Sequence, residues 1–279
     1  MKGTAVSHCF GRMNLTNSKA NGNTCAAMPV PNGQWDISSK NDAWVWDSRT
    51  GQLQTVATPL QGRPMISPQG NFVYWWDANE RQWFVYDNHD RFTRNITGDI
   101  PVNFWDEKND VPSTPGSYGI AAWTENDGYI LVNDAFDIWK IDPKGATKPE
   151  NFTGHTGRND SITFRYVRTD PEKRFIEPGD LLLLSAFDRK TKQSGYYTLA
   201  QKGRNPLKKR TMDSFSFTSI SKAKDKEVYA FLKNNFQTSP DLHVTQTFWQ
   251  STEKLTDINP QMRDYNWGTA ELFSWTSFT

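Results

Sequence analysis

The chain has 279 residues, and its 32 Lys and Arg against 31 Asp and Glu give a net charge of +1 at pH 7. So small a net charge creates no extended positive potential that would attract a polyphosphate backbone. We therefore expect neither nucleic acid nor an anionic membrane as a partner. The longest apolar run, Leu181–Leu184, is far shorter than the roughly 20 residues of a transmembrane helix, so no membrane span is expected. The 12 Trp, 18 Gly and 15 Pro favour a sheet-rich fold with many turns.

The N-terminal segment, residues 1–40, is rich in Asn, Ser, Thr and Gly and lacks a clear strand pattern. We predict an irregular segment here, with the alternative that it forms part of a sheet. Its start has no apolar run of the kind that a secretory signal needs, so no such signal is expected. Both cysteines of the chain, Cys9 and Cys25, lie in this segment. They are too few for a disulfide framework, and a single bridge between them is left open.

Residues 41–264 contain a weak internal repeat built on short aromatic and apolar strands. Five such strands end at Asp47, Asp87, Asp142, Ala200 and Thr245, and the fifth is the least clear. The separations between these ends are 40, 55, 58 and 45 residues. They bracket the length of a four-stranded propeller blade once loop insertions are allowed.

A threonine follows four of these strand ends at a nearly constant distance. The interval is 10 residues to Thr97 and 11 residues to each of Thr153, Thr211 and Thr256. A constant interval predicts that the same turn joins two adjacent strands in each unit.

Two further strands precede the repeated strand in each later unit and are joined by a short turn. Residues 64–66 and 72–76 flank the turn Ser67–Gly70, and residues 119–123 and 129–132 flank Glu125–Gly128, whose Asp-Gly pair favours a hairpin. We therefore predict an all-β fold, a β-propeller with about five recognisable four-stranded blades over residues 41–264. An incomplete ring and an extra N-terminal blade are the alternatives.

Two segments depart from the repeat. Residues 99–117 contain three prolines and are predicted to be a long loop inserted between blades. Residues 265–279 are aromatic and apolar, and we predict a strand that leads out of the propeller.

No sequence motif for catalysis is found, and we predict no catalytic, cofactor-binding or metal-binding residue. The nearest approach to a Gly-x-Ser-x-Gly elbow, Gly116–Gly119, has its first glycine misplaced. There is no glycine-rich phosphate loop, so no cofactor is expected. The histidines lack metal-site spacing: they are His8, His89, His155 and His243. The spacing of the carboxylates does not single out an acid–base pair among candidates such as Asp134, Asp137 and Glu271.

Several strings of the sequence resemble the propeller of the prolyl oligopeptidase family of serine peptidases. They are Ser117–Asp127, Phe136–Pro143, Pro240–Val244, Leu255–Gln261 and Tyr265–Leu272. The resemblance runs from about Arg63 to the end of the chain, and it is strongest to the bacterial dipeptidyl peptidase and acylaminoacyl peptidase-like branch. In that family the last of these strings leads into a C-terminal α/β-hydrolase domain that carries the catalytic triad.

The resemblance implies a noncatalytic propeller domain that gates and positions short peptides for an α/β-hydrolase domain missing from this chain. It also implies a serine peptidase as the parent protein and an exported or periplasmic location. Propellers of the family usually have more blades than the five counted here. One alternative is a free-standing propeller interaction module, whose loop 99–117 would present Phe104 and Trp105 to a partner. Another is a glycosidase with carboxylates converging on the propeller axis.

Overall fold

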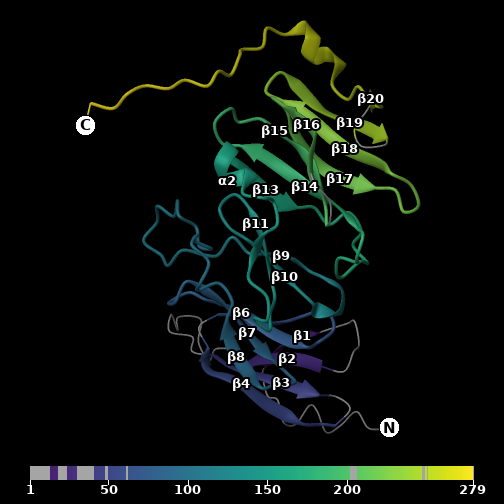
Figure 1. Ribbon diagram of the computed structural model, residues 1–279. Helices are drawn as coiled ribbons and strands as arrows, with labels where there is room; N and C mark the ends of the chain where they lie inside the picture. Colours follow the sequence, from purple (N-terminus) through teal and green to yellow (C-terminus); the bar gives the residue numbers. More distant parts are fainter. Residues whose placement is uncertain are drawn as a thin grey trace. The chain divides into compact units, whose positions relative to one another are not determined.

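The computed structural model describes residues 13–17, 24–29, 41–47, 50–60, 62–201, 206–246, 249 and 251–278. In these residues the chain forms twenty strands in five four-stranded antiparallel sheets (Figure 1). Strand order within each sheet follows chain order. The prediction of an all-β fold made of four-stranded propeller blades is confirmed.

The five sheets are numbered here as blades 1 to 5. Blade 1 contains β1 (Met13–Asn17), β2 (Thr24–Pro29), β3 (Asn41–Asp47) and β4 (Leu53–Leu60). Blade 2 contains β5 (Met65–Ile66), β6 (Phe72–Asp77), β7 (Gln82–Asp87) and β8 (Phe92–Asn95). Blade 3 contains β9 (Ile120–Trp123), β10 (Ile130–Asn133), β11 (Ile138–Ile141) and β12 (Glu150–Asn151).

Blade 4 contains β13 (Ile162–Tyr166), β14 (Leu181–Asp188), β15 (Ser194–Ala200) and β16 (Leu207–Asp213). Blade 5 contains β17 (Ser216–Lys222), β18 (Val228–Asn235), β19 (Thr238–Gln246) and β20 (Ser251–Lys254). Three short helical turns complete the described elements: η1 (Glu125–Asp127), α2 (Thr156–Asp160) and η2 (Pro260–Asp264).

The blades group into two compact units. The first unit consists of Met1–Phe152 with Arg174–Pro178 and holds blades 1 to 3. The second consists of Thr153–Lys173 with Gly179–Thr279 and holds blades 4 and 5. Ile176 belongs to the first unit because its N–H donates to the Trp123 carbonyl and its carbonyl accepts the Glu125 N–H, both at 2.8 Å.

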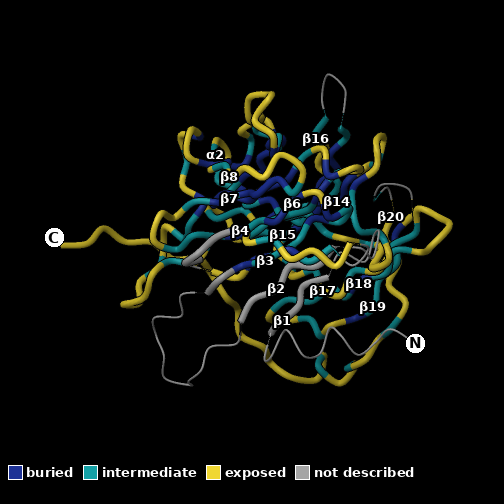
Figure 2. The backbone as a smooth tube through the Cα atoms, turned by 90° about the horizontal axis from the view of Figure 1, so that it is seen from below, coloured by how far each residue is buried: buried dark blue, intermediate teal, exposed yellow. Residues whose placement is uncertain are grey.

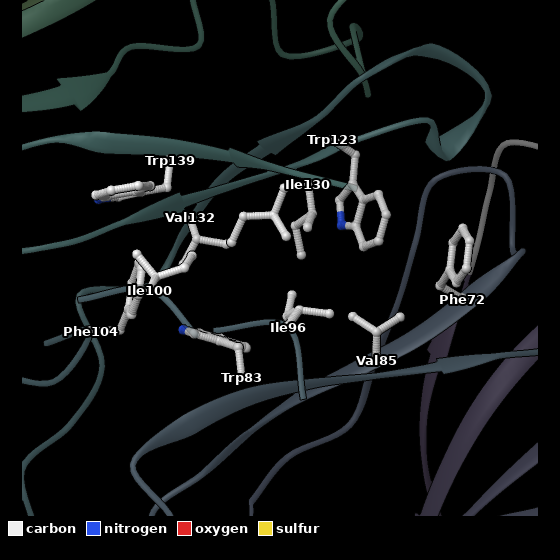
Figure 3. Close-up of a cluster of buried hydrophobic side chains, with 11 residues drawn as sticks. Phe72, Trp83, Val85, Ile96, Ile100, Phe104, Trp123, Ile130, Val132 and Trp139 are labelled. Atoms are coloured by element: carbon white, nitrogen blue, oxygen red, sulfur yellow. The ribbon is translucent and has the colours of Figure 1, made fainter. Parts of the chain in front are cut away.

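The core of the first unit lies on both faces of blade 2. Successive side chains of a strand point to opposite faces of its sheet, so the run Phe72–Trp76 supplies apolar groups to both. Val73 and Trp75 pack with side chains of blade 1. Phe72 lies on the other face, where its ring stacks on Trp123 of blade 3 at 5.7 Å. Figure 3 shows the cluster between blades 2 and 3.

In the second unit, blades 4 and 5 meet through aromatic rings. Tyr196 of β15 lies edge-on to Phe217 of β17, with ring centroids 5.9 Å apart. Trp249, from the β19–β20 connection, stacks on Phe231 of β18 at 5.7 Å and contacts Tyr196 at 4.9 Å. Burial raises the pKa of Tyr196 to about 12, as expected for a phenol enclosed by other rings.

The predicted threonine turn is present in the structure. The residue before the threonine donates its N–H to the third strand of the same blade, as Ile96 does to Trp83 at 3.0 Å and Leu255 does to Leu242 at 2.8 Å. The Thr97 hydroxyl accepts the N–H of Trp83 at 2.9 Å, and Thr256 makes the same bond with Leu242. In blade 4, Thr211 lies within β16 and pairs with Tyr196 instead.

Three parts of the chain differ from the prediction or extend it. Within residues 1–40, β1 and β2 complete blade 1, whereas Cys9 and His8 lie outside the described residues. Residues 265–278 do not form the predicted strand. In the loop 99–117, Phe104 is only 1% exposed and packs edge-on against Trp139 at 6.4 Å, so it is a core residue.

Candidate functional site

The carboxylates considered from the sequence lie in two units: Asp134 and Asp137 are both buried at one turn of the first unit, and Glu271 belongs to the second. Asp134 is fully buried and holds the β10–β11 turn: its Oδ1 accepts the N–H groups of Phe136 and Asp137, each at 2.6 Å. Its Oδ2 accepts the indole N–H of Trp139 at 3.0 Å. Glu271 is exposed in the C-terminal segment, in the other unit. Asp134, whose oxygens accept hydrogen bonds from its own turn and from Trp139, therefore has a structural role.

The other polar groups considered from the sequence have separate local surroundings. His89 is exposed beside Asp90, His155 has a left-handed backbone conformation before α2, and His243 stacks on Phe231 at 5.9 Å. Burial lowers the pKa of His243. Ser117 forms an isolated bridge with Trp105. Within the described ranges, no three His, Cys, Asp or Glu side chains gather as metal ligands, and no helix is long and apolar enough to cross a bilayer.

One buried carboxylate joins blades 2 and 3. Asp127, at the β9–β10 turn, is 1% exposed, and its Oδ2 accepts the Ser67 hydroxyl at 2.6 Å. The same side chain accepts backbone N–H groups of Gln69 at 3.0 Å and Asn71 at 3.2 Å. Burial raises the pKa of Asp127, and these hydrogen bonds oppose the shift. The sequence predicted only a turn at Asp127, because a contact with another blade leaves no local signal.

A second polar network holds the chain where it leaves blade 5. Asp241 is 2% exposed and accepts from the Thr256 hydroxyl and the Ile258 N–H, each at 2.9 Å, and from Lys254 Nζ at 2.7 Å. Lys254 also pairs with Asp257 at 3.0 Å. The bond to Lys254 is the main reason that the pKa of Asp241 is lowered to about 2. The network fixes the start of the exit segment, residues 255–278.

The exit segment exposes apolar side chains along its length. Its first part is anchored, because Trp267 lies edge-on to Phe236 at 6.5 Å and donates its indole N–H to the Met262 carbonyl at 2.8 Å. Further on, Phe273 is 77% and Trp275 76% exposed, and their rings stack on each other at 5.8 Å. Figure 2 shows this part of the backbone as a continuous exposed stretch towards the C-terminus. Contiguous exposed apolar groups of this kind mark interaction surfaces.

The second unit also contains a charged cavity, of about 690 Å³, beside Tyr166 and Tyr229. Lys173 lies 2.7 Å from Asp180, and Lys222 lies 3.0 Å from Glu227, so two of the three lysines on this wall are paired with carboxylates. The Tyr229 hydroxyl donates to Glu227 at 2.8 Å. Partly exposed ion pairs contribute about 0–1 kcal/mol each.

No protein-family model and no curated protein matches the sequence significantly. Among solved structures, a protein assigned as a dipeptidyl aminopeptidase IV from Bacteroides ovatus ATCC 8483 has a TM-score of 0.55 at 9% identity, over 88% of this chain and 39% of that chain. Dipeptidyl peptidase 4 from Porphyromonas gingivalis has a TM-score of 0.53 at 9% identity, over 90% of this chain and 37% of that chain. TolB from Acinetobacter baumannii has a TM-score of 0.41 at 14% identity, over 84% of this chain and 53% of that chain.

The first two comparisons concern the fold. This chain spans less than two fifths of the length of either dipeptidyl peptidase. The expected likeness to the propeller region of these peptidases is confirmed at the level of the fold. The chain thus shares the β-propeller fold found in dipeptidyl peptidases.

Proposed function

We propose that this chain is the noncatalytic propeller domain of a prolyl oligopeptidase-family serine peptidase, which admits and positions short peptides for a separate α/β-hydrolase domain. The observation that carries the proposal is the exit segment, whose apolar side chains are exposed beyond Gly268. An adjoining domain would remove these groups from water. The two dipeptidyl peptidases of like fold have more than half of their length outside the matched part, which leaves room for such a domain.

The network around Asp241 supports this role. Its bonds to Lys254, Thr256 and Ile258 fix the direction in which the chain leaves blade 5. A fixed exit gives the adjoining domain a defined position relative to blade 5, which positioning a substrate requires.

The charged cavity supports peptides as the substrate class. Its lysine–carboxylate pairs offer partners for both ends of a short peptide, since Lys173 and Lys222 attract a carboxylate while Asp180 and Glu227 attract an ammonium group.

The alternative, a free-standing interaction module, is less well supported. It relied on Phe104 and Trp105 in the loop 99–117. Phe104 is buried, and the Trp105 ring lies under the Arg81 guanidinium at 4.7 Å, so neither ring is presented freely to a partner.

Hydrogen exchange on residues 265–278 tests the proposal. In the isolated chain we expect rapid exchange at these amides, because residues 265–278 are exposed and lie outside the strands of the blades. In the polypeptide encoded by the reading frame continued past Thr279, we expect them to be protected. The proposal is wrong if that frame contains no Gly-x-Ser-x-Gly elbow, or if the exchange of these amides is as rapid in the longer polypeptide.

A further inference from the structure

A cavity of about 550 Å³ in the first unit lies between β8 and the β11–β12 hairpin. It is separate from the exit segment and from the charged cavity, which belong to the other unit. Part of its wall consists of buried apolar side chains of the core cluster between blades 2 and 3. They are Ile96, Ile100, Trp139 and Ile141. Figure 3 shows Ile100 and Trp139 in this cluster.

Arg94 is one of the charged residues of the cavity wall. Its guanidinium carbon lies 4.7 Å from the centroid of the Phe92 ring. Gly145, which has a φ of +71°, lies opposite, and a Cβ atom added there would be 3.9 Å from Arg94 Cδ. The Nη1 atom of Arg94 is buried and has no hydrogen-bond partner in the described part of the chain. A buried guanidinium N–H without an acceptor is unfavourable until an acceptor reaches it.

Asp142 and Asn95, two of the acceptors of the wall, are already used by their own turns, and Asp99 is a further carboxylate of the wall. Asp142 accepts the N–H groups of Lys144 at 2.8 Å and of Ala146 and Thr147 at 3.0 Å. Asn95 Oδ1 accepts the N–H group of Gly98 at 2.8 Å. The wall thus combines an apolar surface with two cationic side chains, Arg94 and Lys148, and the buried Nη1 atom of Arg94 lacks an acceptor in the described part of the chain.

We propose that this cavity binds a small carboxylate with an apolar body. The guanidinium of Arg94 would hold the carboxylate, because the planar fork of arginine matches the two oxygens of that group. The apolar body would lie on Trp139 and the isoleucines. Ligand pockets typically combine a mostly apolar wall with a few placed polar groups in a volume of this order. The proposal does not depend on the proposed peptidase role, since neither Arg94 nor the cavity takes part in it.

Calorimetric titration of the isolated chain with 3-phenylpropionate and with its neutral amide tests the carboxylate preference. We expect saturable binding of the acid, and binding of the amide that is weaker by about tenfold or more, because only the acid pairs with a guanidinium. Equal affinities, or no saturable binding of the acid, would overturn the proposal.

Three variants locate the site. Arg94→Met is expected to abolish the preference for the acid, and Ala146→Trp to block both probes by filling the cavity. Arg91→Met is the matched control, because Arg91 precedes the same strand but does not line the cavity, and its binding is expected to equal that of the unmodified chain. Acid binding that survives both Arg94→Met and Ala146→Trp places the ligand elsewhere and refutes the proposal. Should Arg94→Met fail to fold, the acid–amide pair and Ala146→Trp still decide the question.

Discussion

Blades 2 and 5 have the same strand order but are covered to very different extents. In blade 2 both faces are buried, and side chains such as Val73 and Val85 are inaccessible to solvent or nearly so. In β17–β20 of blade 5, only Phe231, Asp241 and Thr245 are buried, and apolar residues such as Leu232 and Val244 are half-buried. Alternating apolar residues therefore suffice to form the sheet of a blade. Its side chains become fully buried only where neighbouring groups pack on both of its faces.

The largest expected effect is the loss of a buried ring from blade 2. Phe72→Ala removes a side chain that is 3% exposed and stacked on Trp123, so we expect the free energy of unfolding to fall by about 3–5 kcal/mol. Phe236→Ala in blade 5 is the matched control. Its ring is 59% exposed, and we expect a change within about 0.5 kcal/mol. Urea unfolding measures both changes. Equal losses of unfolding free energy would contradict the difference in burial between blades 2 and 5.

Removal of the carboxylate between blades 2 and 3 should have the next largest effect. Asp127→Ala leaves the Ser67 hydroxyl and the N–H groups of Gln69 and Asn71 without their acceptor, at an expected cost of about 2–3 kcal/mol. A double-mutant cycle with Ser67→Ala isolates the hydroxyl bond. A coupling near zero in that cycle would show that the bond contributes nothing.

The buried carboxylates Asp241 and Asp127 should respond to pH with opposite signs. The pKa of Asp241 is lowered from 3.8 to about 2, so its contribution to stability is present above pH 3.8 and is lost as the pH falls towards 2. The pKa of Asp127 is raised above 3.8, so its effect is a loss of stability as the pH rises through that raised value. The free energy of unfolding of Asp241→Asn and of Asp127→Asn, measured as a function of pH, gives the contribution of each carboxylate.

Lys254→Met tests why the pKa shifts of Asp241 and Asp127 differ in direction, because it removes the main cause of the lowered Asp241 pKa. We expect the carboxyl titration of Asp241, followed by NMR, to move up towards 3.8 while that of Asp127 is unchanged. An unchanged titration of Asp241 would mean that Lys254 does not bind it in solution.

The smallest change in stability is expected in the exit segment. A double substitution, Phe273→Ser with Trp275→Ser, alters two rings that are more than three quarters exposed, so unfolding should change by no more than about 0.5 kcal/mol. Self-association, measured by light scattering, should fall because the apolar surface is reduced. A large loss of stability would show that these rings pack against the blades.

The sequence predicted the features that repeat and missed those that depend on distant contacts. The strands ending at Asp47, Asp87 and Ala200 and the threonine turn were predictable, because turns and alternation are local. For residues 1–40 the sequence favours an irregular segment, with part of a blade as the alternative, since MNLTN and TCAAMP carry little alternation; β1 and β2 correspond to the alternative.

The failures at other positions have the same cause. The contact of Asp127 with Ser67 spans 60 residues and has no local signature. Residues 265–279 have a strand-like sequence, but a strand forms only beside a partner strand, and residues 265–278 do not form one. The same holds for Arg94, whose cavity is formed by two blades.

The most direct test of the proposed role is a peptidase assay on the purified chain alone. A noncatalytic propeller should release no product from chromogenic dipeptide or acyl-amino-acid substrates above the buffer rate. Turnover above that rate, abolished by a serine-directed phosphonate, would show a catalytic serine within these residues and would contradict the proposal.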